Sequence, residues 1–355
     1  MRISQRFTII RTILAIAIAL AVAIGIIFLV SKSPVEAIVY FITGPVKKFS
    51  RLMNVVEMML PLLFTGLSLS LIQRTGVFNL ASEGCFFIGG AVAGLFAVKL
   101  TLPKVIDPLV CILMGGLVGM LCMMIPAVCR LKFGASEVVS SLMMNYVLMY
   151  LGLIMIRVFV RNPDTGQLQS LDFQPQARLS VIIPGTRVHT GLIVAAVLVV
   201  VFWIYLFKSR WGYRMRMTGS NPGYSRYSGI NNTKSILIGQ ALAGLACGIG
   251  GACEVLGLYQ SFKWLALPGY GFDGVIIASL AQNNPILVPV GAFFLAYIRV
   301  GADIMTRMTD VQNEIVSIIQ GVVIVLLSAR AFLGTWEKRE IVREATANAQ
   351  GGEKA

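Results

Sequence analysis

The sequence is poor in charge, in histidine, and in motifs that bind metals or nucleotides. Only 13% of its 355 residues are charged, about half of the roughly 25% usual in soluble domains. This shortage excludes a soluble enzyme. The one histidine is His189, and the six cysteines form no C-x-x-C pair, so we expect no metal site. A G-x-x-x-x-G-K-[ST] phosphate loop is missing too, so we expect this chain to bind no cofactor and any ATP to be hydrolysed by another subunit.

Apolar residues are abundant instead. They make up 57% of the chain, and the mean hydropathy is +0.80. This composition indicates a membrane protein. The net charge of +14 comes from basic residues placed between apolar runs, the pattern of topology signals at membrane edges rather than of a nucleic-acid site. We therefore expect contact with membrane lipid and no nucleic-acid partner.

Uncharged runs predict where the chain crosses the membrane, since a helix needs about 20 residues to span the hydrocarbon layer. The runs are 12–31, 58–73, 84–98, 108–129, 138–156, 188–207, 235–253, 274–298 and 315–329. Within 274–298, Asn283, Asn284 and Pro285 are expected to halt the helix and divide it into two shorter ones. The fold class predicted is an all-α polytopic membrane protein with ten transmembrane helices.

The distribution of Lys and Arg predicts the orientation. Six of the 30 basic residues lie in 208–234, which has no acidic residue, so this loop is predicted to be cytoplasmic. With ten spans, both chain ends are then cytoplasmic, and 161–188 is an extracytoplasmic loop. We expect a membrane domain over 1–334 and a disordered cytoplasmic tail over 335–355.

The loop 208–234 also carries a capped helix signal. Asn221 can cap a helix that starts at Pro222, and Gly229 can end it, which predicts about two turns over 222–228. So short a helix is unstable alone and must dock on the bundle or on a partner. It is either part of a basic, topology-setting turn or a rigid element that transmits force from a cytosolic motor subunit.

Polar side chains inside the apolar runs are candidates for a translocation pathway, because buried polar groups in membranes normally face a cavity or a partner. The alternative is a hydrogen bond between helices. Two further carboxylates, Glu137 and Asp273, lie at span ends. The pathway candidates are Asn79, Glu83, Asn145, Glu254 and Gln320.

Two glycine-rich polar motifs, GVFNLASEG at 76–84 and PGYGFDG at 268–274, each adjoin a short apolar stretch. Short broken helices in corresponding halves of a chain are typical of internally repeated transporters. We therefore expect a pseudo-two-fold internal repeat. Small residues four apart at Gly115 and Gly119 and at Gly244 and Gly248 predict close helix packing.

Six blocks together resemble a known family. They are RTGVFNLASEG (74–84), EVVSSLMMNY (137–146), RWGYRMRMTGSNPGYSRYSGIN (210–231), GGACEVLG (250–257), PGYGFDGVIIASLAQNNP (268–285) and EIVSIIQG (314–321). In this order they resemble permease subunits of bacterial ABC importers of the ribose and branched-chain amino-acid permease family, closest to its nucleoside and simple-sugar members.

This resemblance implies a multi-pass protein of the bacterial inner membrane that passes a nucleoside or simple sugar. The implied partners are a cytosolic ABC ATPase, a second and different permease, and an extracytoplasmic substrate-binding lipoprotein. The segment 219–229 aligns with the family's coupling region. The implied coupling residues are Gly219, Asn221, Pro222, Tyr224, Arg226, Tyr227 and Gly229.

Two other classes remain open. In a proton-coupled secondary transporter, Glu83, Glu137 or Glu254 would carry the protons. The chain could instead be a membrane scaffold or receptor that transports nothing. Uptake that depends on ATP and on a separate nucleotide-binding subunit would distinguish the importer from both.

Overall fold

The computed structural model describes residues 33–311, together with 21, 22, 24, 25, 28 and 321. In this part of the chain, every named element is a helix. Seven of the helices are long and apolar enough to cross a membrane. They are α3 (Phe49–Arg74), α4 (Ser82–Lys99), α5 (Ile106–Phe133), α6 (Glu137–Phe159), α7 (Gly191–Lys208), α10 (Asn232–Leu258) and α12 (Val288–Met308).

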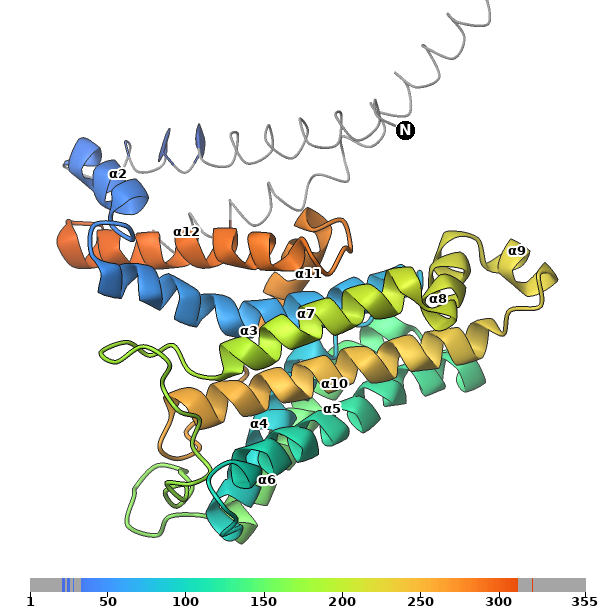
Figure 1. Ribbon diagram of the computed structural model, residues 1–355, viewed down its shortest axis with the longest axis horizontal. Helices are drawn as coiled ribbons and strands as arrows, with labels where there is room; N and C mark the ends of the chain where they lie inside the picture. The colour runs from blue at the N-terminus through green and yellow to red at the C-terminus, as the bar shows by residue number, and fades with distance from the viewer. Residues whose placement is uncertain (1–20, 23, 26–27, 29–32, 312–320, 322–355) are drawn as a thin grey trace, which may run out of the picture. The chain divides into compact units, whose positions relative to one another are not determined.

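The chain forms two compact units, one of Val46–Val300 and one of Met1–Pro45 with Gly301–Ala355. In the larger unit, α10 packs against α3, α4 and α5 (Figure 1). The apolar stretches of α3 and α4 are 78% buried and that of α10 is 67% buried, against 28–33% for α5, α6 and α7. The larger unit therefore has three inner helices, with α5, α6 and α7 exposing most of their surface.

Glycines bring the backbones of α5 and α10 into contact. A Cβ atom added at Gly119 would lie 2.9 Å from the Cα of Gly248, and one added at Gly244 would lie 2.5 Å from the Cβ of Met123. Helices in lipid associate through such close packing, because lipid tails are as apolar as the side chains. The close packing predicted from the paired glycines is confirmed for α5 and α10.

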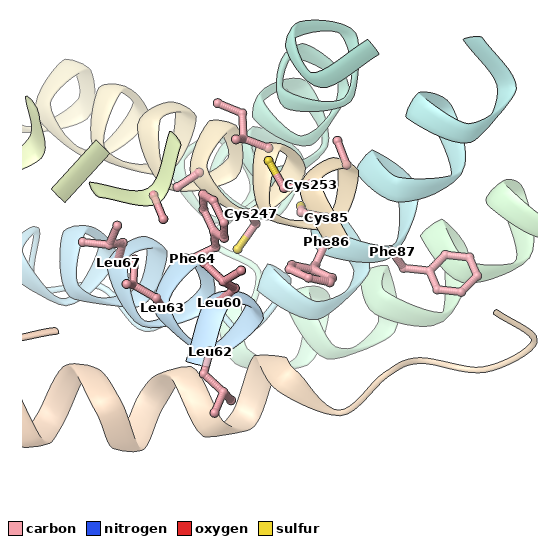
Figure 2. Close-up of a cluster of buried hydrophobic side chains, with 14 of the residues drawn as sticks. Leu60, Leu62, Leu63, Phe64, Leu67, Cys85, Phe86, Phe87, Cys247 and Cys253 are labelled. Atoms are coloured by element: carbon pink, nitrogen blue, oxygen red, sulfur yellow. The ribbon is translucent and has the colours of Figure 1, made fainter. Parts of the chain in front are cut away.

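The buried apolar core lies where the inner helices meet. Figure 2 shows Leu60 and Phe64 of α3, Phe86 of α4, and Cys247 and Cys253 of α10 gathered at this point. All five are at most 1% exposed. The cysteines are free thiols and act here as small apolar side chains. This core holds the inner helices in register.

The chain turns sharply between α11 (Tyr270–Leu280) and α12, as the asparagines and proline predict. Gln282 and Asn283 have φ angles of 53° and 56°, a region that asparagine tolerates better than most residues. Arg74 fixes this turn by donating to the carbonyls of Asn283 at 2.8 Å and Gln282 at 3.0 Å. The break predicted in the uncharged run is confirmed.

The loop 208–234 contains two helices, whereas the sequence predicted one. α9 (Pro222–Tyr227) is the predicted helix, capped by Asn221, which accepts from the Tyr224 N–H at 3.0 Å. The unpredicted helix is α8 (Arg210–Ser220). Its cap is Ser209, whose hydroxyl accepts from the Gly212 N–H at 3.0 Å. The cap outweighs the basic, glycine-containing composition that indicated a loop.

The smaller unit contains α2 (Pro34–Thr43), also unpredicted, and the last turns of α12. Gly44 packs against Ile304, because a Cβ atom added at Gly44 would lie 2.9 Å from the Cγ2 atom of Ile304. Most of the first predicted span, all of the span 315–329 except residue 321, Gln320 and the tail 335–355 lie outside the described residues.

Candidate functional site

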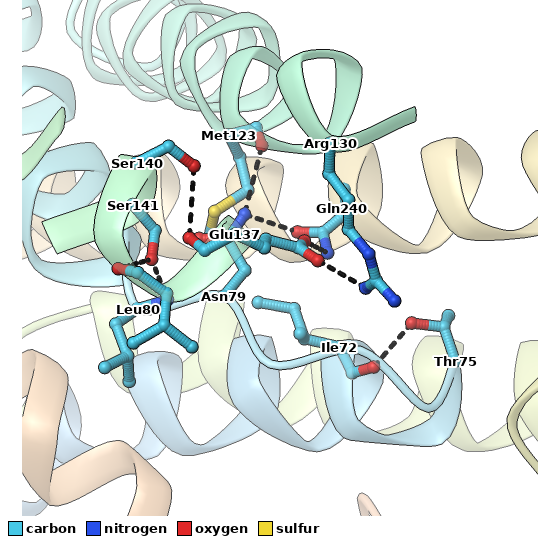
Figure 3. A network of polar contacts seen from close by, with 11 residues as sticks. Ile72, Thr75, Asn79, Leu80, Met123, Arg130, Glu137, Ser140, Ser141 and Gln240 are labelled. Carbon is cyan, nitrogen blue, oxygen red and sulfur yellow. Dashed lines mark hydrogen bonds and ion pairs between the residues drawn. The ribbon is translucent and has the colours of Figure 1, made fainter. Parts of the chain in front are cut away.

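A buried polar network joins three helices near the end of the larger unit that carries α8 (Figure 3). Asn79 donates to the Gln240 Oε1 atom at 2.9 Å, and Gln240 donates to Glu137 Oε1 at 3.0 Å. Arg130 completes the network with an ion pair to Glu137 Oε2 at 2.6 Å. Asn79 and Gln240 are fully buried. The network ties the loop after α3 to α10, α6 and α5.

The side chain of Asn79 is fully engaged inside the protein. Its Oδ1 atom accepts from the Ala81 N–H at 2.8 Å, and its Nδ2 group also contacts the Met123 carbonyl at 3.4 Å. These partners satisfy a buried amide that would otherwise be costly in a low-dielectric interior. In this conformation Asn79 holds the start of α4, and its pathway role stays a prediction.

Asn145, near the middle of α6, holds the same loop from the other side. It donates to the Leu80 carbonyl at 2.9 Å and accepts from the Gly84 N–H at 2.8 Å. Ser141, one turn earlier, accepts from the Leu80 N–H at 3.0 Å. Two hydrogen bonds thus fix the loop 75–81 to α6 and a third fixes the first turn of α4, so loop and helix are expected to move together.

Glu83 brings together the two motifs singled out in the sequence. Its carboxylate accepts from the Gly269 N–H at 2.6 Å, and Gly269 has a φ of 84° at the start of α11. A Cβ at Gly271 would lie 2.5 Å from that of Glu83. The 76–84 and 268–274 motifs are therefore in direct contact.

Glu254 lies beside an aromatic cluster near the other end of α10. It is 4% exposed and lies beside the side chain of Tyr270. Phe86 packs edge-on to Tyr270 at 5.6 Å and stacks on Trp264 at 5.8 Å between ring centroids. Trp264 also contacts Tyr259 at 6.2 Å. A carboxylate among aromatic rings offers both hydrogen bonding and stacking to a ring-bearing solute.

α9 is held rigidly by one asparagine of α10. Asn232 accepts from the hydroxyls of Ser225 at 2.7 Å and Thr218 at 3.2 Å, and donates to the Pro222 carbonyl at 2.8 Å. Gly229, with a φ of 75°, follows the helix as predicted. Tyr227 is 95% exposed. The capped helix therefore exposes an aromatic residue while its own backbone is fixed.

α8 links this helix to the loop after α3. Gly219 lies against Gly76, because a Cβ atom added at Gly219 would lie 2.8 Å from the Gly76 N atom. Gly219 also contacts the Arg74 carbonyl. Arg74 in turn fixes the turn between α11 and α12. Of the predicted coupling residues, Gly219, Asn221, Pro222 and Gly229 have structural roles. Tyr224, Arg226 and Tyr227 are exposed.

Several residues of these clusters were not identified from the sequence. Gln240 and Arg130 join the network but lack a distinctive motif, and Trp264 and Tyr270 reach Glu254 only through the fold. A glutamine inside an uncharged run was the one available signal. Among the described residues, no three His, Cys, Asp or Glu side chains converge as metal ligands.

The fold is that of a multi-pass membrane protein, in which apolar helices enclose buried polar groups. The model of the family described as branched-chain amino acid transport system / permease component matches residues 51–328. The chain belongs to this family. It is therefore a permease subunit of a transporter, located in the cytoplasmic membrane.

Curated relatives are permeases too. The guanosine ABC transporter permease protein NupP of Bacillus subtilis is 29% identical over 77% of this chain and 80% of its own length. The glucose ABC transporter permease protein TsgB13 of Haloferax volcanii is 29% identical, over 87% and 85%. The nucleoside ABC transporter permease protein NupB of Lactococcus lactis is 26% identical, over 84% and 85%. No solved structure matches this chain.

Proposed function

We propose that this chain forms the translocation pathway of an ATP-binding cassette importer for a nucleoside or simple sugar. The observation that carries the proposal is α9: a short helix, capped by Asn221 and tied to α10 by Asn232, with Tyr227 exposed. A helix of six residues has no stability of its own. A fixed, capped and exposed helix is suited to receive force from a partner.

The partners follow from the family and from what this chain lacks. A cytosolic ABC ATPase would bind α9 and hydrolyse ATP, since the sequence has no phosphate loop. A second, different permease would complete the pathway. An extracytoplasmic lipoprotein would deliver the solute, and this chain itself would bind no cofactor.

The contacts supply a route from α9 to the membrane interior. Movement of α9 would reach α8 and, through Gly219, the backbone around Gly76. The loop 75–81 is bonded to α6 and α10 through Asn145 and Asn79. ATP binding by the partner would then favour one of two bundle states by its differential affinity for them.

The topology proposed for this function has ten spans with both ends in the cytoplasm. The seven candidate spans of the described residues and the basic loop 208–234 support it. We extend the proposal to a pseudo-two-fold repeat, supported by contact between the 76–84 and 268–274 motifs. Labelling of single cysteines placed in 161–188 and in 335–355 would test the orientation.

The substrate class rests on the relatives and on the aromatic cluster. The relatives are named as permeases for guanosine, nucleosides and glucose. Tyr270 and Trp264 beside Glu254 suit an uncharged ring with hydrogen-bonding groups. We therefore propose a neutral nucleoside, with a simple sugar as the alternative.

Uptake by the reconstituted complex tests the coupling role. Asn232→Ala removes three hydrogen bonds around α9, and we expect ATP-dependent uptake to fall at least about tenfold, as expected when about 1.4 kcal/mol of coupling is lost. The permease should remain inserted and monodisperse. Tyr213→Ala on the exposed face of α8 is the matched control. Normal uptake by Asn232→Ala would show that α9 is not the coupling element.

A proton-coupled secondary transporter is the second candidate, favoured by the burial of Glu254. This carboxylate lies near Glu57 and, within the described residues, forms no ion pair. Buried carboxylates in membranes often carry protons. Uptake abolished by a protonophore at constant ATP, and by Glu254→Gln, would support this candidate over the importer.

A further inference from the structure

The exposed face of α6 differs chemically from the exposed faces of its neighbours. Tyr146 and Tyr150, one helical turn apart, are each 60% exposed. They lie on one stripe with apolar residues at helical spacing. The other members of this stripe are Val139, Met143, Val147, Leu151, Ile154 and Val158.

The two tyrosines are placed near the middle of the membrane. Glu137, in its ion pair with Arg130, begins α6, and Arg157 lies in the last turn. At 1.5 Å per residue, Tyr146 lies about 14 Å along the helix from Glu137, and Tyr150 about 10 Å from Arg157. Charged groups at both ends of a span approximately 30 Å long mark the two membrane surfaces. The tyrosines therefore lie at the depth of the hydrocarbon.

Hydrocarbon is a poor environment for these hydroxyls. Within the described part of the chain, neither hydroxyl has a hydrogen-bond partner. Unsatisfied polar groups are costly in lipid, and tyrosines in membrane proteins gather instead at the two interfaces. Water or a solute on this face would satisfy both hydroxyls.

The other outer helices show what a face suited to lipid looks like. The exposed residues of α7 include Ile193, Val197, Val200 and Ile204, all aliphatic. Its Trp203 and Tyr205 lie in the last turns, near Lys208, as an interfacial belt requires. α5 exposes Leu109, Leu113, Leu117, Leu121 and Ile125. Among these three helices, α6 alone carries exposed aromatic hydroxyls at mid-depth.

The inner face of the same turn is bonded to the loop 75–81 and the start of α4, and this loop contacts α8. Asn145, next to Tyr146 in the chain, binds the Leu80 carbonyl and the Gly84 N–H. Gly76, at the start of that loop, contacts Gly219. A displacement that begins near α9 would therefore reach α6 at the level of the tyrosines.

From these observations we propose that Tyr146 and Tyr150 of α6 line the aqueous translocation pathway and contact the solute. The two rings offer faces on which a nucleoside base stacks and hydroxyls that bind its polar groups. This inference rests on the proposed function and deepens it. It identifies α6 as a helix that lines the pathway and an uncharged, ring-bearing solute as the substrate.

Accessibility to a water-soluble thiol reagent tests the location. Tyr146→Cys and Tyr150→Cys are made in the full transporter in vesicles, with Val200→Cys on α7 as the control at similar depth. A charged methanethiosulfonate reacts with thiolates, which form only where water reaches. We expect both α6 cysteines to be modified, to be protected by guanosine or uridine, and Val200→Cys to stay unmodified above the wild-type background.

Transport kinetics test the contact. Tyr146→Ala and Tyr150→Ala are each expected to raise the KM for guanosine about tenfold, since stacking on one aromatic ring is worth about 1–3 kcal/mol. Tyr→Phe at either position keeps the ring and should change KM less than about threefold, while Val200→Ala should leave it unchanged.

The outcomes separate this inference from the proposed function. Cysteines on α6 that stay as unreactive as Val200→Cys would place the face in lipid or in a dry protein contact and overturn the inference. Modification without protection, together with unchanged KM in both alanine variants, would overturn solute contact. Wild-type uptake that does not need ATP would instead refute the importer, whereas the labelling contrast would still decide the location of α6.

Discussion

α10 and α7 are both apolar enough to cross a membrane but have opposite surroundings. The apolar stretch of α10 is 67% buried and that of α7 28%. Along α10, glycines face α5, α3 and α4, including Gly248 against Gly119 and Gly250 against Phe64. α7 carries valines, leucines and isoleucines along its length and has its one glycine, Gly191, at its first position. α6 equals α10 in mean hydropathy and yet is only 28% buried, so hydropathy alone does not distinguish an inner helix from an outer one here, and the small residues of α10 do.

This contrast follows from the physics of the bilayer. In water, burial of apolar area separates inside from outside, but lipid gives no such preference between apolar surfaces. Close backbone approach and buried hydrogen bonds remain as the forces that choose which helices pack inside. α10 has both, through its glycines and through Gln240.

The largest expected effect comes from filling the space at α10. Gly248→Leu would place a side chain against the backbone of Gly115 and Gly116, and we expect loss of monodisperse protein on size exclusion, since overpacking costs at least about 1–3 kcal/mol. Val200→Leu on α7 should elute like the wild type. Normal elution of Gly248→Leu would contradict the close packing of α5 and α10.

A smaller effect is expected from the network that α10 shares with α6. Glu137→Ala would leave Gln240 without its acceptor and remove the ion pair of the half-exposed Arg130, lowering stability by about 2 kcal/mol. Asp303→Ala, which breaks an exposed ion pair with Arg307, should cost less than about 0.5 kcal/mol. Thermal unfolding in detergent measures both, and equal losses would refute the importance of the buried network.

An effect seen only at acid pH is expected where α10 ends and α7 begins. The His189 ring is fully buried against Gly257 and accepts from the Gly191 N–H at 3.2 Å. Burial lowers the pKa of His189 to about 4 from 6.5. The unfolded chain therefore binds more protons between these values. The stabilisation is complete above pH 6.5 and is lost as the pH falls toward 4.

Comparison with a variant that cannot titrate isolates this effect. His189→Phe keeps a ring of similar size but loses the hydrogen bond to Gly191, so we expect a uniformly lower Tm with a flatter decline between pH 7 and 4.5. Parallel Tm curves for the two proteins would show that His189 does not contribute to acid sensitivity.

Helix positions were largely predictable from the sequence. Uncharged runs located α3, α4, α5, α6 and α10, because each backbone must satisfy its own hydrogen bonds in lipid. Asn221 and Pro222 located α9. α2 and α8 were missed, since neither has a long apolar run and α8 depends on the local cap at Ser209. The exact number of spans and the orientation stay predictions.

The candidate site was predictable only in part. Buried polar residues drew attention to Asn79, Glu83, Asn145 and Glu254, yet their partners come from residues 60 to 190 positions away or from other helices. The exposed pair Tyr146 and Tyr150 was not identified as a candidate from the sequence, because tyrosine is ordinary in an apolar run. The significance of these two tyrosines depends on which face of α6 is covered by the other helices.

By itself, the amino-acid sequence determined that this protein is a set of membrane-crossing helices of a permease family with a short capped helix between two of them. Hydrocarbon requires long uncharged helices, and caps and turns are local, so both can be read along the chain. Tertiary structure alone decided which helices lie inside, which polar groups are bonded to one another and which tyrosines are left exposed. These depend on contacts between distant segments, to which hydropathy along the chain is blind.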